Sequence, residues 1–399
     1  MARDPSITVV APTPFFTEGG CSYRVLGEVR AFLRAGRPTR VLTYPSGRDL
    51  PGVDIRRPRR SSRRMGIGMN PVRTVYDTEL LRLLLRQGSS RSPWHVHLHE
   101  GAFLGGIVRA LRDQRFVVDL EGSFVEEAGR TVSALAHGPV HRLARRFEGF
   151  LERTASEVIV SSAGLYEAMT ERGHLPRDRL HLVPDGVDVS LFTPRSASLS
   201  EEGRRWRKSL GFSADDVVAV YIGGISPQQG IDDLLAQAPK MIREVPSLRF
   251  VVWGVAAQRF SLDRYLAEVE RLGLGKHVRF PGGLPFEQVP SALEACDIGI
   301  TWKTSALEGS GKIPLYMSAG IPTVASRIPA HLHYLGAAGE RGGAIVKTPE
   351  EGAAALVALA RDPGRRLQLG QTARRVAEQE LSWDVAARRI FEIHARVEG

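Results

Sequence analysis

The sequence predicts an α/β protein with two doubly wound, Rossmann-like domains in tandem. Short apolar runs alternate with amphipathic segments of helical period along almost all 399 residues, a pattern typical of βαβ units and parallel sheets. A stretch rich in Ser, Arg and Glu interrupts the alternation at residues 194–206. Because a chain of this length exceeds one ordinary hydrophobic core, each half is expected to form a domain of its own.

The first domain is expected to comprise residues 1–193. Its apolar runs predict strands at Ile7–Ala11, Arg40–Thr43, His95–His99, Phe116–Leu120, Val158–Ser161 and His181–Pro184. The segments between them predict helices at Tyr23–Ala35, Asp77–Arg86, Ala102–Arg112 and His141–Ala155. Because helices separate most of these strands, the strands should lie parallel.

The second domain is expected to comprise residues 194–380. Its predicted strands are Val217–Ile222, Leu248–Trp253, Val278–Phe280, Ile298–Thr301, Thr323–Ala325 and Ala344–Val346. Its predicted helices are Ile231–Ile242, Ser261–Leu272, Val289–Ala295 and Pro349–Ala360. A last helix at Trp383–Val397, within residues 381–399, is expected to pack back on the first domain. Two such domains facing each other would form a cleft, since doubly wound sheets bind ligands outside the carboxyl ends of their strands.

Composition is typical of a soluble globular protein, and the two cysteines fit a reducing cytoplasm. Hydrophobic residues make up 43% and charged residues 25% of the sequence. No apolar run reaches the roughly 18 residues of a membrane-spanning helix, and Ile7–Ala11 is too short for a signal peptide. The two cysteines, Cys21 and Cys296, are far apart and show no metal-ligand spacing, so we expect neither a disulfide nor a bound metal.

The formal net charge of +10 favours anionic partners. Arginines crowd one segment, at Arg56, Arg57, Arg59, Arg60, Arg63, Arg64 and Arg73. This segment is either a solvated basic loop or a patch that binds an anionic acceptor or membrane surface, which would place the protein at the inner membrane face. Aromatic residues do not interleave with these arginines, so nucleic acid is not expected as a partner.

The glycine-rich segment Glu308-Gly309-Ser310-Gly311-Lys312 precedes a predicted helix and strand. It combines a carboxylate, which can accept from sugar hydroxyls, with an ammonium group and backbone N–H donors for phosphate. A P-loop is excluded because Ala306 stands at its first glycine position and Ile313 follows Lys312. The segment therefore suits a nucleotide sugar.

Other candidate ligand-binding residues also follow predicted strands. Gly19-Gly20 precedes a helix and is either a phosphate loop or a tight turn, and Gly223-Gly224 allows a similarly close backbone approach. Gly283 and Leu284 could pair through their backbone with a flat base. Lys303 follows a strand and is either a surface lysine or an anion ligand.

Candidate acid–base residues lie where two strands of the first domain end. His95, His97 and His99 alternate along one strand and should share a face. Such a strand spreads three side chains over about 13 Å, too far for one tetrahedral metal, so His99 is interpreted as a polar cleft residue. Glu121 follows the next strand and is either a general base or substrate ligand, or a capping carboxylate.

Taken together, four motifs resemble a family 4 retaining glycosyltransferase of the GT-B fold over nearly the whole chain. The motifs are Gly19-Gly20, His97-Leu98-His99-Glu100, Pro184-Asp185-Gly186-Val187-Asp188 with Phe192 and Pro194, and Glu308-Gly309-x-Gly311 with Met317-x-Ala319-Gly320-x-Pro322-x-Val324. The resemblance implies sugar transfer from a nucleotide-diphosphate sugar with retention at the anomeric carbon. It implies no metal and no cofactor, and an acceptor that is a glycan, a lipid-linked molecule or a small molecule.

The resemblance also implies roles for individual residues. The donor would lie mainly on the second domain, with Glu308 on its sugar hydroxyls and Lys303 and Lys312 facing its phosphates. Gly309, Ser310 and Gly311 would complete the anion site through their backbone. His99 and Glu121 would shape the sugar and acceptor pocket.

The sequence departs from the family pattern at three positions. Gly224 and Gln229 stand where the family usually has Arg and Lys, and Tyr316 stands where it has a second glutamate. Two alternatives therefore remain open: a sugar-nucleotide-binding partner protein without turnover, and a nucleotide-sugar epimerase of the same fold.

Overall fold

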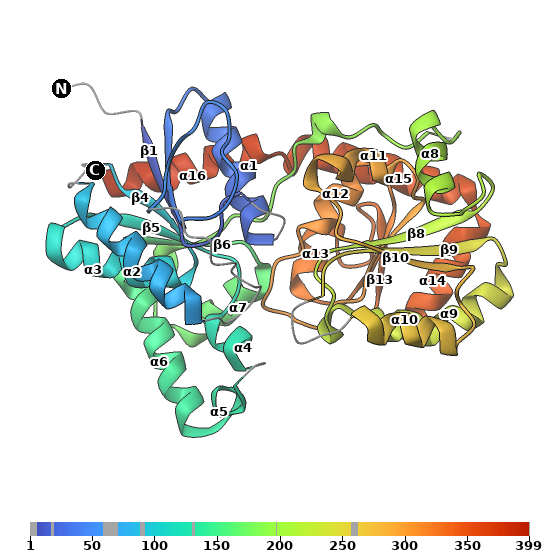
Figure 1. The fold of residues 1–399 in the computed structure, drawn as a ribbon, viewed down its shortest axis with the longest axis horizontal. Helices are drawn as coiled ribbons and strands as arrows, with labels where there is room; N and C mark the ends of the chain where they lie inside the picture. The colour runs from blue at the N-terminus through green and yellow to red at the C-terminus, as the bar shows by residue number, and fades with distance from the viewer. Residues whose placement is uncertain are drawn as a thin grey trace. The chain divides into compact units, whose positions relative to one another are not determined.

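The computed structural model describes residues 6–16, 20–58, 71–87, 92–129, 132–196, 198–256 and 262–398. The chain divides into two compact units, each built on a parallel sheet (Figure 1). Unit 1 comprises Met1–Gly186, Leu307–Gly309 and Trp383–Gly399, and unit 2 comprises Val187–Ala306 and Ser310–Ser382. The domain boundary was expected between residues 193 and 194, whereas the units change between Gly186 and Val187.

Unit 1 has a parallel sheet with the strand order β3-β2-β1-β4-β5-β6-β7. Its strands are β1 (Ile7–Ala11), β2 (Thr39–Thr43), β3 (Asp54–Arg56), β4 (Trp94–His97), β5 (Phe116–Leu120), β6 (Glu157–Val160) and β7 (Leu180–Leu182). Its α-helices are α1 (Gly20–Arg34), α2 (Pro71–Arg86), α3 (Leu98–Arg112), α4 (Phe124–Gly129), α5 (Ser133–Ala136), α6 (Gly138–Thr154), α7 (Ala163–Arg172) and α16 (Trp383–Glu398). The strands of this sheet are rich in β-branched residues with both faces covered, as parallel sheets require.

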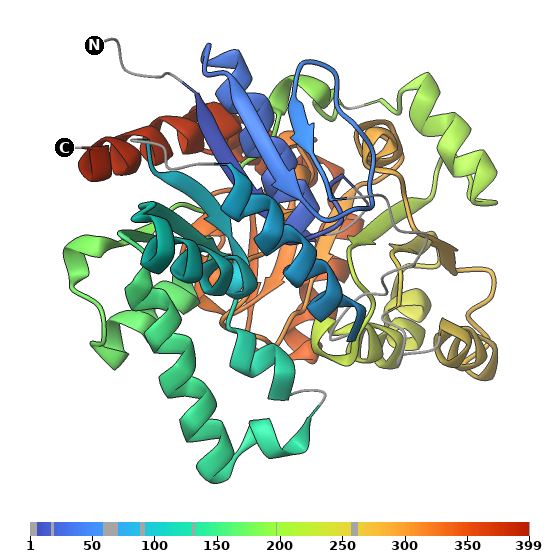
Figure 2. The same ribbon diagram turned by 60° about the vertical axis from the view of Figure 1, so that its left-hand side comes forward.

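The C-terminal helix α16 packs against α1 within unit 1 (Figures 1 and 2). Trp383, at its start, is buried against Gly27 of α1 and against Gly186. A Cβ atom on Gly27 would lie 2.1 Å from the indole ring, so only glycine leaves room for the tryptophan there. The contact therefore depends on two residues more than 350 positions apart.

Unit 2 has a parallel sheet with the strand order β10-β9-β8-β11-β12-β13. Its strands are β8 (Val217–Ile222), β9 (Leu248–Trp253), β10 (Val278–Gly282), β11 (Ile298–Thr301), β12 (Thr323–Ser326) and β13 (Gly343–Val346). Its α-helices are α8 (Glu201–Ser209), α9 (Ile231–Glu244), α10 (Leu262–Arg271), α11 (Val289–Leu293), α12 (Lys312–Ser318), α13 (Pro329–Leu335), α14 (Pro349–Arg361) and α15 (Pro363–Glu380).

Each predicted strand matches an observed one to within two residues at both ends, and the strand predicted at His95–His99 runs two residues too far. β4 stops at His97, and α3 begins at Leu98 with no intervening loop. Leu98 has a positive φ of 66°, which turns the chain sharply from strand to helix. His99 therefore lies in the first turn of a helix. The edge strand β3 and the helices α4, α5, α13 and α15 were not predicted.

Candidate functional site

The carboxyl ends of β8 and β11 form the switch point of the sheet in unit 2. From these two central strands the sheet continues through β9 and β10 on one side and through β12 and β13 on the other. Doubly wound sheets bind ligands at such a point. Gly223 and Gly224 follow β8, and Lys303 follows β11, so the fold brings the predicted donor-binding residues of unit 2 to this edge.

Lys312, the first residue of α12, reaches the glycine loop after β8. Its Nζ donates to Gln229 Oε1 at 3.2 Å and lies 4.9 Å from the ring centre of Tyr221. The Tyr221 hydroxyl in turn donates to the Gly224 carbonyl at 2.6 Å and lies 3.0 Å from Gln229 Oε1. The ammonium group thus stands beside Gln229, the position at which the family pattern has its own lysine.

Gly223 is required where the loop meets the lysine. Its φ is +146°, and a Cβ atom there would lie 3.1 Å from the Tyr221 hydroxyl and 3.2 Å from Lys312 Cε. At Gly224 a Cβ atom would meet nothing within 4 Å. The backbone is therefore closely packed at Gly223 and open at Gly224, as a loop that approaches a ligand through its main chain must be.

His331 of α13 contacts the glycine-rich segment through the side chain of Ser310. Its Nδ1 donates to the Ser326 carbonyl at 2.8 Å, which leaves Nε2 as acceptor for the Ser310 hydroxyl at 3.1 Å. Burial, together with the charges of Lys312 and Lys303, lowers the pKa of His331 to about 3. The imidazole is therefore neutral at physiological pH and holds Ser310 in place.

Lys303 is not a surface lysine. Its side chain is buried, and its carbonyl accepts from the Ser326 hydroxyl. The charges of Lys303 and Lys312 both lower the pKa of His331, so the two cations lie in the same region of unit 2. The surface alternative for Lys303 is therefore wrong.

Tyr316, at the position of the expected second glutamate, has a structural role. It is fully buried, and its hydroxyl accepts from the Ile222 backbone N–H at the end of β8, at 2.9 Å. A Cβ atom on Gly299 of β11 would lie 2.5 Å from the tyrosine ring. The side chain thus fixes α12 to both central strands.

The remaining predicted donor-binding residues have simpler placements. Gly283 and Leu284 follow the edge strand β10, and Gly311 directly precedes α12. Glu308 is half-buried in a bend, and Leu307–Gly309 group with unit 1 while Ser310 and the residues after it group with unit 2. Gly20 begins α1, and Gly19 lies outside the described residues.

A buried ionic network lies beneath the carboxyl edge of the sheet in unit 1. Arg24 of α1 binds Asp119 of β5 through Nε at 2.9 Å and Nη2 at 2.7 Å, and it binds Asp185 at 3.1 Å. Glu28, one helical turn later, lies 3.2 Å from Arg24 Nε. Burial by itself lowers the pKa of Arg24, but the surrounding carboxylates outweigh that effect and raise the pKa above its usual range. The sequence signal was an Arg and a Glu four residues apart in the predicted helix Tyr23–Ala35, and it was missed.

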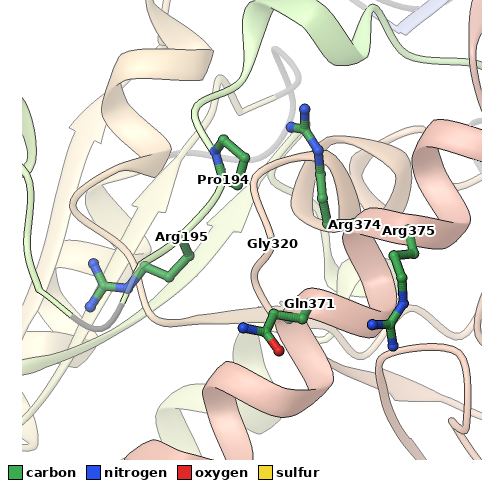
Figure 3. A pocket seen from close by; sticks show the side chains of 7 residues that line it. Pro194, Arg195, Gly320, Gln371, Arg374 and Arg375 are labelled. Carbon is green, nitrogen blue, oxygen red and sulfur yellow. The ribbon is translucent and has the colours of Figure 1, made fainter.

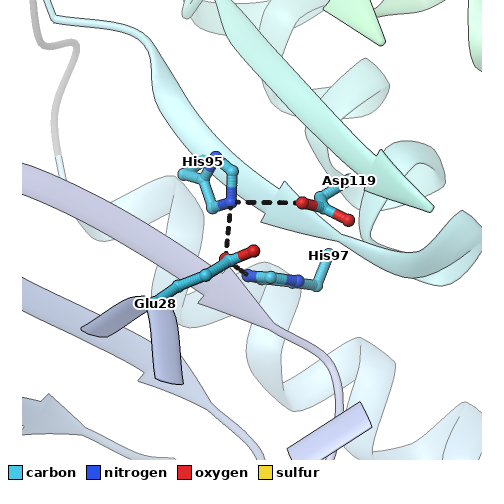
Figure 4. Close-up of side chains that lie close together, drawn as sticks. All are labelled: Glu28, His95, His97 and Asp119. Atoms are coloured by element: carbon cyan, nitrogen blue, oxygen red, sulfur yellow. Dashed lines mark hydrogen bonds and ion pairs between the residues drawn. The ribbon is translucent and has the colours of Figure 1, made fainter. Parts of the chain in front are cut away.

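His95 and His97 belong to this network (Figure 4). His95 Nε2 lies 3.0 Å and His97 Nε2 3.3 Å from Glu28 Oε2, so these two rings do share a face as predicted. Glu28, His95, His97 and Asp119 could in principle surround a metal. Arg24, however, already binds both carboxylates, and a second buried cation would meet its charge. The cluster therefore fits a structural ion network better than a metal centre.

Glu121 directly follows β5 and has an unusual carboxyl group. Its Oε1 is buried and has no hydrogen-bond partner among the residues that the structure describes. Burial, followed by the charge of Asp185, raises its pKa to about 8, although Arg24 opposes the shift. A buried acceptor or donor without a partner is costly and rare, so this atom is a candidate for binding a ligand.

His99 does not lie at a strand end. It is buried in the first turn of α3, where its Nε2 lies 3.4 Å from Glu152 Oε1 and 3.7 Å from Glu148 Oε1 of α6. Burial opposes its charge, but Glu152 and Glu148 outweigh that effect and raise its pKa. His174 binds the other oxygen of Glu152. The interpretation of His99 as a strand-end residue is therefore corrected: it links α3 to α6 through an ion pair.

A pocket of about 250 Å³ in unit 2 is lined by Pro194, Arg195, Gly320, Gly370, Gln371, Arg374 and Arg375 (Figure 3). Its three guanidinium groups point in different directions. Arg195 binds Asp297, Arg374 binds the Phe192 carbonyl, and Arg375 donates to Thr372. Because these arginines are engaged elsewhere and diverge, the pocket does not form an anion site.

The arginine-rich segment is described only in part, because residues 59–70 lie outside the described residues. Arg56 pairs with Asp54 at 3.2 Å, Arg57 binds Asp49, and Arg73 pairs with Glu100 at 3.2 Å. The three described arginines are thus each matched by a nearby acid. Among the described helices, none is both long and apolar enough to cross a bilayer.

Comparison with known families identifies the chain. The model for "Glycosyl transferase 4-like domain" matches residues 19–186, and the model for "Glycosyl transferases group 1" matches residues 203–376. The chain is a family 4 glycosyltransferase with the GT-B fold. The predicted family, fold class and enzyme class of this glycosyltransferase are therefore confirmed.

Relatives and solved structures agree with this assignment. The glycosyltransferase is 27% identical to a D-inositol 3-phosphate glycosyltransferase of Thermomonospora curvata, covering 94% of this chain and 90% of the relative. It is 28% identical to a GDP-mannose-dependent phosphatidylinositol monomannoside mannosyltransferase of Corynebacterium glutamicum, over 53% of this chain and 55% of the relative. The sucrose-phosphate synthase structure from Thermosynechococcus elongatus has a TM-score of 0.79 at 18% identity, covering 98% of both chains. Anabaena HepE, solved with UDP-glucose, has a TM-score of 0.74 at 16% identity, covering 98% of this chain and 99% of that one.

Proposed function

We propose that this glycosyltransferase moves a sugar from a nucleotide-diphosphate sugar to an acceptor, with retention at the anomeric carbon. The diphosphate of the donor binds at the β8–β11 switch point of unit 2, near Gly223 and Lys312, and Glu308 is the proposed ligand of its sugar hydroxyls. The observation that carries the proposal is the position of the Lys312 ammonium group, 3.2 Å from Gln229 Oε1.

That position supports the proposal because this chain lacks the Arg and the Lys that the family usually has in the loop after β8. A diphosphate leaving group develops negative charge during transfer, and positive groups in fixed positions stabilise it without a divalent ion. Gly224 and Gln229 supply no charge, but Lys312 brings one to the same loop, and Lys303 lies in the same region. We therefore interpret the two lysines as replacements for the usual Arg and Lys.

Glu121 is the proposed polar group of the acceptor side. With a pKa of about 8 its carboxyl is mostly protonated at pH 7, so it donates a hydrogen bond to a sugar or acceptor hydroxyl. His99 was predicted to share this pocket, but its contacts with Glu148 and Glu152 favour a supporting role.

The test is a thermal-shift panel of UDP-, GDP-, ADP- and dTDP-sugars, because a ligand that binds only the native state raises the midpoint of unfolding. We expect one nucleotide class to stabilise the protein, and Lys312→Met to abolish most of that shift. Lys240→Met, an exposed lysine on α9, is the matched control. No stabilisation by any of the four classes would overturn the proposal.

The alternative of a binding protein without turnover is motivated by Tyr316, which is committed to the backbone of Ile222 and cannot replace the missing glutamate. Donor hydrolysis and transfer, measured with a broad acceptor set, separate the two functions. Binding without turnover, with Glu308→Ala indistinguishable from the wild type, would favour the alternative.

The acceptor and the location of the protein are proposed from the resemblance and the composition. A glycan, lipid-linked or small-molecule acceptor in the cytoplasm is proposed, and the distant cysteines, both free, suit a reducing compartment. Contact between Arg56–Arg64 and an anionic membrane is tested by Arg60→Glu with Arg63→Glu, which should weaken vesicle sedimentation. Unchanged sedimentation would exclude this segment as the contact.

A further inference from the structure

Helix α6 in unit 1 has its apolar residues on the outside. Val140, Leu143, Phe147 and Phe150 are 48%, 67%, 47% and 54% exposed. Their spacing of three, four and three residues places them along one face of the helix. A helix on the surface of a globular protein normally turns such a stripe toward the core, so this arrangement needs an explanation.

The inner face of α6 is polar for a reason given above. Glu148 and Glu152 are each only 1% exposed and are held by His99, Arg145, Arg172 and His174. The ion pairs with α3 thus use the side of the helix that would otherwise bury apolar residues. Both acidic residues of α6 are therefore buried, and neither lies on its outer face.

The exposed stripe continues onto α3 through Phe103, which is 45% exposed. Its ring centre lies 6.4 Å from that of Phe147, which lies 6.5 Å from that of Phe150. In both views α6 extends away from the sheet of unit 1, with α5 at its far end (Figures 1 and 2). The three rings therefore form a continuous aromatic patch on a projecting helix.

Arginines border this patch. Arg142, Arg146 and Arg153 are exposed on α6, next in sequence to the apolar residues or within three positions of them. Apolar and aromatic side chains flanked by basic ones are the composition of helices that lie in the interface of anionic bilayers. A second copy of the chain fits less well, because a self-complementary contact would bring these arginines against each other.

We propose that the outer face of α6, together with Phe103, docks the protein on an anionic lipid membrane. The aromatic and aliphatic side chains enter the boundary between headgroups and acyl chains, and the arginines meet the lipid phosphates. This surface shares no residue with the proposed donor site, so membrane docking and glycosyl transfer can be tested separately.

The experiment is co-sedimentation of the full chain with vesicles of phosphatidylcholine alone or with phosphatidylglycerol, at low and high salt. We expect binding only with the anionic lipid and weaker binding at high salt. Arg142→Gln with Arg146→Gln should weaken it by about fivefold for each arginine. Phe147→Ser with Phe150→Ser should weaken it by at least about tenfold.

Matched controls separate this surface from general effects. Arg388→Gln with Arg389→Gln on α16 and Leu266→Ser on α10 change exposed residues of the same kinds and should leave vesicle binding unchanged. Circular dichroism and the midpoint of thermal unfolding show that the α6 variants are folded, and nucleotide-sugar stabilisation shows that their donor site is intact.

Three results would overturn the proposal. The wild type could fail to bind anionic vesicles, or the control variants could lose binding as much as the α6 variants. Alternatively, sedimentation velocity could show a dimer that Phe147→Ser with Phe150→Ser converts to a monomer. That last result would assign the face to self-association.

Discussion

At the scale of single residues, we propose that Lys312 supplies the positive charge that the loop after β8 lacks. Gln229 lacks the charge that the family pattern has there, and Lys312, more than 80 positions later, donates to its amide oxygen. The cation now comes from α12 instead of the loop after β8. Electrostatic stabilisation depends on where a charge lies, not on which segment supplies it.

This interpretation predicts a rescue. Lys312→Met should lower kcat/KM by about 100-fold, since removing one well-placed group at a developing charge commonly costs about 3 kcal/mol. Adding Gln229→Lys to that variant should recover at least about tenfold, because the new ammonium group stands at the vacated position. Steady-state kinetics with the donor identified by thermal shift measures both. A double variant no better than Lys312→Met would show that Lys312 acts in another way.

Glu121 gives a second prediction at this scale, on pH. If its protonated carboxyl donates to a substrate hydroxyl, kcat/KM should fall as the pH rises through about 8. Glu121→Gln keeps a donor and should remove that alkaline decline while retaining most activity at pH 7. Glu121→Ala should lose about tenfold, the value of one buried hydrogen bond. An inactive Gln variant would instead indicate a general base.

At the scale of elements, the helix α13 stabilises the glycine-rich segment 308–312 through a side-chain contact. His331 joins Ser310 of the glycine-rich segment to the end of β12 through Ser326. Such a support is possible only with a neutral imidazole, because the two ring nitrogens take opposite hydrogen-bonding roles. Burial, together with the neighbouring lysines, maintains that state by disfavouring a proton on the ring.

The low pKa of His331 predicts how stability depends on pH. The unfolded chain takes up a proton on this residue near pH 6.5, and the folded chain only near pH 3. The free energy of unfolding should therefore be fully retained above about pH 6.5 and fall as the pH decreases toward 3. Between pH 7 and pH 5 the loss from this residue is on the order of 2 kcal/mol.

Urea unfolding of the wild type and of His331→Asn at pH 7 and pH 5 isolates this effect. The variant should be less stable at pH 7 but should lose less stability between the two pH values. Equal losses would mean that His331 is protonated in the folded protein. His394, whose pKa burial also lowers to about 3, should behave in the same direction and serves as an independent case.

At the scale of the whole molecule, the chain passes between its two compact units more than once. After unit 2, residues from Trp383 onward return to unit 1, where α16 packs on α1. His394 of α16 also reaches the buried network, with its Nε2 3.1 Å from His95 Nδ1. One face of α16 is therefore part of the first unit's core, with Trp383, Ile390 and His394 buried.

This arrangement predicts that Trp383 is a major source of stability for unit 1. Trp383→Ala should lower the free energy of unfolding by about 3–5 kcal/mol, because it leaves a large cavity against Gly27 and Gly186. The exposed change Arg388→Gln on the same helix should have little effect. Chemical unfolding followed by fluorescence and circular dichroism measures both. A loss below about 1 kcal/mol would show that α16 contributes little to the fold.

The sequence by itself determined the two parallel sheets, most strand positions and the family, because periodic apolar runs and contiguous motifs are local signals. It also singled out Lys312 and Glu121, which directly follow recognisable loops and strands. Only the tertiary structure decided the contacts between residues far apart in the sequence. These are Lys312 with Gln229, His331 with Ser310, Tyr316 with the Ile222 backbone and His99 with Glu152. It also decided that α6 faces outward with its apolar side. Those outcomes depend on contacts between side chains of different elements, and the spacing of residues along one segment does not reveal such contacts.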